Sequence, residues 1–186
     1  MPAIRPVEFH PMIVHFPIAL LILSVTFDFL GVFLRRWGLT TAATWLLLFG
    51  TPSAGVALLT GWVSERYVVG VGAGDELLSL HKIVAVLTTL LFGLLLGMRL
   101  IWLTPRGFGL LKRRGVTSGL IASADHALRA ALPILYEPPL PAAAVAFYLF
   151  LSLVAVALLG LTGYLGGALV YDHGVTLPGA FISTLL

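Results

Sequence analysis

The sequence predicts an all-α integral membrane protein in which four transmembrane helices form an antiparallel bundle. Of its 186 residues, 59% are hydrophobic and only 10% are charged, whereas a soluble domain carries about 25% charged residues. The apolar residues fall into four stretches that are each long enough to cross the hydrocarbon core of a bilayer. The chain has no cysteine, which excludes disulfides, thiolate metal sites and cysteine-ligated iron–sulfur clusters.

The apolar stretches define one four-helix domain that covers residues 1–186. We expect its spans at about residues 12–34, 41–63, 77–103 and 142–171. Pro17 would lie in the first turn of the first span, where a missing N–H costs little, and Pro11 would leave His10 ahead of the helix. The segment from Arg35 to Gly38 would close this span, with glycine as the stop signal.

The third and fourth spans are joined by a basic loop at residues 104–140. Residues 118–135 mix apolar and charged side chains, which predicts an amphipathic helix at the membrane surface. The short run from Lys112 to Arg114 is typical of a topology signal and of a contact with anionic lipid, and we expect no nucleic-acid binding. We find no internal repeat in the sequence.

Charge predicts the orientation of the bundle. Four spans place both termini on one side of the membrane, and the basic residues gather on the other side: Arg35, Arg36, Arg99, Arg106, Lys112, Arg113, Arg114 and Arg129. The positive-inside rule makes this basic side cytoplasmic and both termini extracytoplasmic.

Four histidines follow from this topology as candidate site residues on the extracytoplasmic side. His10 and His15 open the first span, His81 opens the third and His173 follows the fourth, whereas His126 lies on the cytoplasmic side. Helix ends in a bundle are about 8–10 Å from their neighbours. Imidazoles from three helices can therefore reach one common site.

Two chemistries fit such a cluster. The first is a b-type haem with two axial imidazoles, for which His15 and His81 are the preferred pair and His173 or His10 the substitutes; the glycines of the fourth span would admit the macrocycle, at Gly163, Gly166 and Gly167. The second is a zinc, copper or iron site in which these histidines are joined by a carboxylate such as Glu8 or Asp172. Histidines at membrane interfaces also serve as turn and cap residues, and neutral imidazoles can line a proton-relay or quinone pocket.

One carboxylate lies inside the first span. Asp28 is about 9 Å from the cytoplasmic end of its helix, and Arg99 in the third span lies at a similar depth. An ionisable side chain in a membrane needs a partner within the protein. We therefore expect a structural ion pair between Asp28 and Arg99, in preference to a proton-carrying role for Asp28.

The opening and closing motifs resemble a known family. The segments from His10 to Leu20, from Phe27 to Gly31 and from Gly163 to Val175, together with Thr60-Gly61 and His81, are similar to a bacterial membrane-protein family known as domain-of-unknown-function family 2231. The resemblance covers most of the chain except residues 104–140. It implies four membrane spans but no activity, and it implies that His10, His15, Asp28, His81 and His173 are pattern residues.

These observations favour a redox protein of the bacterial cytoplasmic (inner) membrane. We expect it to bind b-type haem and to transfer electrons, with other membrane redox subunits or a cytochrome as partners in a respiratory or photosynthetic assembly. A metal-binding membrane protein and a structural subunit without a cofactor are the alternatives. No substrate pocket is evident, so the sequence leaves open whether the chain is an enzyme.

Overall fold

A computed structural model describes residues 6–65, 75–113, 119–131 and 141–171, and these residues form helices without any β-strand. The helices are α1 Pro6–Phe33, α2 Trp37–Glu65, α3 Asp75–Arg113, α4 Gly119–Ala131 and α6 Ala142–Tyr171. Four of them contain segments that are long and apolar enough to cross a membrane, namely His10–Phe33, Trp37–Glu65, Glu76–Leu103 and Ala142–Val170. The predicted all-α fold with four membrane spans is confirmed.

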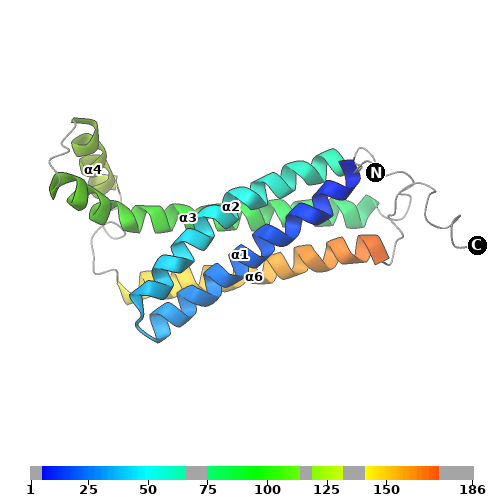
Figure 1. The fold of residues 1–186 in the computed structure, drawn as a ribbon, viewed down its shortest axis with the longest axis horizontal. Coiled ribbons are helices and arrows are strands. Elements are labelled where there is room, and N and C mark those ends of the chain that lie inside the picture. Colours follow the sequence, from blue (N-terminus) through cyan, green and yellow to red (C-terminus); the bar gives the residue numbers. More distant parts are fainter. Residues whose placement is uncertain (1–5, 66–74, 114–118, 132–140, 172–186) are drawn as a thin grey trace, which may run out of the picture.

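The four long helices form an up-and-down bundle (Figure 1). Helix α1 packs most extensively on α2, and α3 packs most extensively on α6, so the bundle consists of two helical hairpins. Smaller contacts of α2 with α3 and of α1 with α6 close the ring. Helices α1 and α3 therefore face each other diagonally and run in the same direction. We call the end where α1 and α3 begin the histidine end.

The core in the middle of the bundle is apolar and tightly packed. Leu21, Leu47, Phe92 and Leu95 are at most 1% exposed, and with Tyr148 and Ala155 they belong to one cluster that draws on all four long helices. Helices α1 and α2 approach each other so closely at Gly50 that a Cβ there would lie only 2.8 Å from Leu21 Cδ2. Small residues allow helices to pack this closely in a membrane. Van der Waals contact then holds them together, because the hydrophobic effect does not drive helices to associate in lipid.

The first helix begins earlier than the sequence suggested. Helix α1 starts at Pro6, so that Pro11 and Pro17 both lie inside it. The predictions that Pro11 precedes the helix and that Pro17 occupies its first turn were wrong. His10 is therefore a helical residue whose side chain has a fixed direction. It cannot turn back toward the N-terminal end of the first span.

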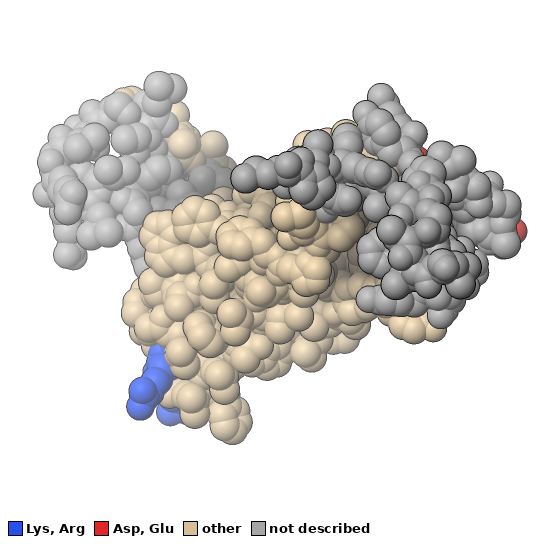
Figure 2. Space-filling model, turned by 45° about the vertical axis from the view of Figure 1, so that its right-hand side comes forward, with Lys and Arg blue, Asp and Glu red and all other residues tan. Residues whose placement is uncertain are grey.

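A tight turn joins α1 to α2. Arg35 adopts φ 52°, and the amide of Arg36 donates to the carbonyl of Gly31 at 2.9 Å, as in a Schellman helix end. Gly38, which was expected to stop the first helix, lies in the first turn of α2 instead. Exposed Arg35 and Arg36 mark this end of the bundle, and the basic patch stands out at one end of an otherwise uncharged face in Figure 2.

The region after the third span is more helical than the predicted loop at residues 104–140. Helix α3 continues to Arg113, and α4 occupies residues 119–131 within the predicted amphipathic segment. Figure 1 shows α4 beyond the end of the bundle that is opposite the histidine end. The long connection is therefore an extension of α3 followed by a separate short helix.

The structure contains the ion pair between Asp28 and Arg99 that the sequence predicted. Arg99 Nη2 forms an ion pair with Asp28 Oδ1, while the Tyr148 hydroxyl donates to Asp28 Oδ2 at 3.0 Å and accepts from Arg99 at 3.1 Å. The Asp28 side chain is 2% exposed and that of Arg99 11%. This cluster links α1, α3 and α6 near the end opposite the histidines.

The two hairpins are repeats of each other, contrary to the expectation from sequence. Asp28 and Arg99 are 71 positions apart, and so are His10 and His81. In the second helix of each hairpin, buried positions recur at a spacing of 105: Ala43 with Tyr148, Leu47 with Ser152, Gly50 with Ala155, and Ser64 with Leu169. An approximate two-fold axis along the bundle therefore exchanges α1 with α3 and α2 with α6, as in transporters built from parallel repeats.

This symmetry predicts that the buried charges can be exchanged. The single variants Asp28→Arg and Arg99→Asp each create a like-charged pair and are expected to lose about 3–5 kcal/mol of unfolding free energy. Because the two positions are equivalent, the double variant D28R/R99D should recover at least half of that loss. The measurement is SDS-induced unfolding in mixed micelles, with Thr26→Ala on the exposed face of α1 as the control. A double variant no more stable than the weaker single variant would contradict the repeat.

Candidate functional site

The first site histidine is held by the neighbouring helix of its own hairpin. His10 Nδ1 lies 3.0 Å from the carbonyl oxygen of Ala57 and 3.3 Å from Thr60 Oγ1. A carbonyl oxygen only accepts hydrogen bonds, so Nδ1 carries the proton and donates. The Thr60 hydroxyl itself donates to Ala57 O at 2.9 Å, which leaves its oxygen as a second acceptor for the imidazole.

The second site histidine repeats this arrangement in the other hairpin. His81 Nδ1 donates to the carbonyl oxygen of Thr162 at 3.1 Å. The Thr162 side chain in turn lies 3.1 Å from Thr88 Oγ1, one hydroxyl against the other. Ala57 and Thr162, which supply the two carbonyls, are 105 positions apart and are equivalent in the repeat.

A glycine lies beneath each imidazole. A Cβ at Gly61 would stand 3.1 Å from His10 Cε1, and a Cβ at Gly166 would stand 3.2 Å from His81 Cε1. These glycines are also 105 positions apart. Each ring therefore lies against the backbone of a neighbouring helix, four residues beyond the carbonyl that accepts its proton. Any larger residue would push the ring away by a few tenths of an ångström.

The two imidazoles lie at the same end of the bundle. They extend from diagonally opposed helices at equivalent positions of the repeat. With Nδ1 engaged, the Nε2 atom of each ring carries its lone pair and has no hydrogen-bond partner among the contacts of the described residues. Ligand histidines are typically fixed in this way, with the second nitrogen donating to a carbonyl or a carboxylate.

His15 does not share this site. Five residues along a helix turn the side chain by about 140°, so that His15 is exposed while His10 faces α2. His15 Nδ1 is 2.7 Å from the carbonyl of Pro11 in its own helix. The structure thus places His10, and not His15, opposite His81. The predicted pairing of His15 with His81 assumed that the helix begins after Pro11, whereas α1 begins at Pro6 and directs His10, not His15, toward α2.

The other predicted site residues divide into two groups. The side chain of Glu8, together with Asp172 and His173, lies outside the described part of the chain. Gly163 and Gly167 border open space and do not contact the imidazoles. Within the described ranges, no three His, Asp or Glu side chains gather closely enough to hold a metal ion. The donor set that the structure brings together is therefore a pair of imidazoles.

Sequence reasoning missed the residues that fix this pair. Ala57 and Thr162 act through their carbonyl groups in apolar helices and carry no signal of their own, whereas Thr60 entered only through the Thr60-Gly61 motif of the family resemblance. The shared spacing of 71 in His10–His81 and Asp28–Arg99 was present in the sequence. That spacing would have revealed the repeat and the pairing of His10 with His81.

A second ion pair lies beside the site and was also missed. Lys82 Nζ is 2.7 Å from Glu65 Oε1, and both side chains are 36% exposed. The pair joins the end of α2 to the start of α3. It has no counterpart in the repeat, because the equivalent positions hold Pro11 and Val170. The two sides of the histidine site therefore differ in polarity.

The hydrogen bonds predict a defined tautomer for both site histidines. In protein labelled with ¹⁵N-histidine and free of ligands at pH 8, His10 and His81 should show a protonated Nδ1 and an unprotonated Nε2. Solution or solid-state NMR can read the two nitrogens, with each signal assigned by its loss in His10→Gln or His81→Gln. Protonation of Nε2 in either residue would contradict the described geometry.

Comparison with known proteins places the chain in a family without assigning an activity. A family model described as "Predicted membrane protein (DUF2231)" matches residues 6–124 and 110–178. No curated protein and no solved structure matches the chain. The two matched segments together cover all four spans of the bundle and both site histidines. The chain therefore belongs to the DUF2231 family of predicted membrane proteins.

Proposed function

We propose that His10 and His81 are the axial ligands of a b-type haem and that the protein transfers electrons in the membrane. The observation that carries this proposal is the matched pair of imidazoles, one from each hairpin, whose Nδ1 protons are held by backbone carbonyls. This arrangement leaves two Nε2 lone pairs for one metal centre. When bound, haem supplies one-electron chemistry, and the protein supplies its position and its polarity.

The number of ligands favours haem over a bare metal ion. Haem iron receives four nitrogens from the porphyrin and needs two from the protein, which a pair of imidazoles provides. Protein zinc sites use three or four protein ligands, and the described residues bring together no group of three. A zinc or copper site would require a further ligand from the undescribed segments, such as His173.

The described residues in contact with the imidazoles are small. Ala57, Gly61 and Gly166 place little or no side-chain volume beside the two rings. The contacts of α2 with α3 and of α1 with α6 are smaller than the contacts within each hairpin, so the bundle is least tightly closed along these two seams. Cofactors in helical bundles are commonly bound between facing helices in this manner.

Charge supports the orientation in which the site is extracytoplasmic. Exposed Arg35 and Arg36 lie at the end opposite the histidine end, and the sequence adds Lys112, Arg113 and Arg114 there. The positive-inside rule assigns that end to the cytoplasm of a bacterial inner membrane. The buried core, which all four long helices share, lies between the two ends. Electron partners, such as a cytochrome or another redox subunit, would then approach the haem from outside.

The proposal predicts a characteristic absorption spectrum. The protein purified after expression with haem precursors should show a Soret band and, after reduction, sharp α and β bands. His10→Ala and His81→Ala should each lower the haem content at least fivefold, because each removes one axial ligand. His15→Ala should retain wild-type content, since His15 lies outside the site, and this variant serves as the control.

Three results would contradict the proposal. One is a protein that stays colourless under these conditions. Another is stoichiometric zinc or copper in place of haem by elemental analysis, which would favour the metal-binding alternative. The third is a spectrum that depends on His15 and not on His10.

The glycines under the rings provide a second prediction with matched controls. Gly61→Ala and Gly166→Ala place a methyl group within 3.1–3.2 Å of an imidazole and should weaken haem retention by at least threefold. Gly55→Ala and Gly163→Ala lie on the same two helices, where a Cβ meets nothing within 4 Å, and should leave retention unchanged. Haem transfer to apomyoglobin measures the retention. Equal effects in all four variants would show that the rings do not depend on contact with the helix backbone.

A further inference from the structure

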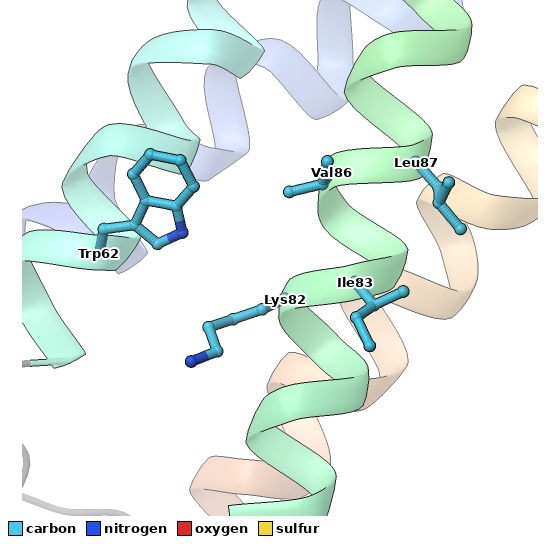
Figure 3. A pocket seen from close by; sticks show the side chains of 5 residues that line it. All are labelled: Trp62, Lys82, Ile83, Val86 and Leu87. Carbon is cyan, nitrogen blue, oxygen red and sulfur yellow. The ribbon is translucent and has the colours of Figure 1, made fainter.

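A shallow groove runs along the seam between α2 and α3, beside the histidine site. It has a volume of about 300 Å³ and is lined by Trp62, Lys82, Ile83, Val86 and Leu87. Figure 3 shows the Trp62 indole on α2 facing Val86 and Lys82 across the seam. The walls face the surroundings of the bundle, because Trp62, Ile83 and Leu87 are 51%, 58% and 51% exposed. In a membrane, this groove opens toward lipid.

The groove adjoins both site histidines through the chain itself. Trp62 directly follows Gly61, on which the His10 ring rests, and Lys82 directly follows His81. A molecule in the groove would therefore lie beside the helix segments that carry His81 and the Gly61 contact of His10. In the equivalent seam between α1 and α6, the repeat places Gly167 where α2 has Trp62 and Phe16 where α3 has Leu87.

The polar groups of the groove form a neutral pair. Lys82 lines the groove and is bound at 2.7 Å to Glu65, so their charges compensate each other, while the ammonium keeps further N–H donors and the carboxylate further acceptor positions. An anionic phospholipid headgroup would need an uncompensated cation to be attracted here. A neutral, flat head with carbonyl or hydroxyl oxygens fits better, since it can stack on the indole and bond to either member of the pair.

We propose that this groove binds the head of a lipid-soluble quinone and that the quinone exchanges electrons with the centre at His10 and His81. The inference rests on the proposed function, because it assigns the electron donor or acceptor of that centre. The isoprenoid tail extends into lipid past Ile83 and Leu87, and the ring lies against Trp62. Lys82 donates to a quinone carbonyl, whereas Glu65 accepts from a hydroquinone hydroxyl.

The electron balance of the step is simple. One hydroquinone gives up two electrons and two protons and becomes a quinone. A haem held by His10 and His81 would accept these electrons one at a time, on two protein molecules or on one centre that is reoxidised between transfers. The protons leave through the Glu65 carboxylate, which is partly exposed at the histidine end, to the adjacent water.

The test uses haem-loaded full-length protein in nanodiscs of phosphatidylcholine, with decylubiquinol as the probe. Stopped-flow absorption follows the reduction of the haem. Trp62→Ala and the groove-filling variant Val86→Trp should lower the second-order rate at least tenfold, while haem content and reduction by dithionite remain unchanged. Trp45→Ala is the matched control, because Trp45 lies on the same helix and is similarly exposed at 56%. It should react at the wild-type rate.

Two kinetic outcomes would overturn the inference. In one, all variants are reduced by decylubiquinol at the wild-type rate. In the other, dithionite reduces the wild-type haem but decylubiquinol does not. Both outcomes leave the haem proposal intact, so the failure of the quinone site can be told from the failure of the haem site.

A binding measurement tests the groove without haem. In the double variant His10→Ala/His81→Ala, decylubiquinone should quench tryptophan fluorescence saturably, and further substitution by Trp62→Ala or Val86→Trp should abolish the saturable part. Absence of saturable quenching would overturn the inference. Quenching by brominated phosphatidylglycerol that decylubiquinone does not relieve would also overturn it, because the occupant would then be an anionic lipid.

Discussion

Polar side chains inside this bundle must find their partners within the protein, because lipid offers none. Hydroxyl groups meet this requirement by donating to backbone carbonyls: Ser24 to Ala43, Thr88 to Val84 and Ser152 to Tyr148. Asp28 meets it through Arg99 and Tyr148. In the two site histidines Nδ1 is bound to a backbone carbonyl, and no hydrogen bond to Nε2 is present among the described residues. The proposed function assigns these two Nε2 atoms to a ligand.

The repeat explains why these features occur in pairs. Each hairpin contributes one imidazole near the histidine end and one charge near the opposite end, 18 residues or about five helical turns away on the same face. The charges differ in sign, and this difference has a consequence for assembly. Two copies of the first hairpin would bring two aspartates together, and two copies of the second would bring two arginines together. The Asp28–Arg99 pair thus favours association of unlike hairpins within one chain, which is also the association that completes the histidine site.

Composition and hydropathy were sufficient to predict the fold class, the four spans and the Asp28–Arg99 pair. These properties depend on the amount and depth of apolar and charged residues, which a linear sequence records directly. The start of α1 was not predictable, because the sequence offers both an early and a late proline and each fits a helix beginning. That choice decides which histidine faces α2. His15 was preferred over His10 because it lies just inside the apolar boundary, but depth in the membrane does not tell which face of the helix a side chain takes.

The repeat was missed for a different physical reason. The equivalent residues are mostly unlike in type, such as Ala43 with Tyr148 and Leu47 with Ser152. Equivalent positions of the two hairpins are both buried against a neighbouring helix, but different residue types fill them. The inserted region between α3 and α6, which includes α4, also shifts the spacing from 71 to 105 and hides the register. The carbonyls of Ala57 and Thr162 leave no trace in the sequence at all, since every residue has one.

The central claim is that one imidazole from each hairpin binds the same iron. Electron paramagnetic resonance of the ferric protein tests it most directly. The wild-type protein is predicted to give a six-coordinate low-spin signal with two imidazole ligands. His10→Ala and His81→Ala, as far as they retain haem, are each predicted to give a high-spin signal, and imidazole added to either variant should restore the low-spin form. A low-spin bis-imidazole signal that survives either substitution would contradict the claim.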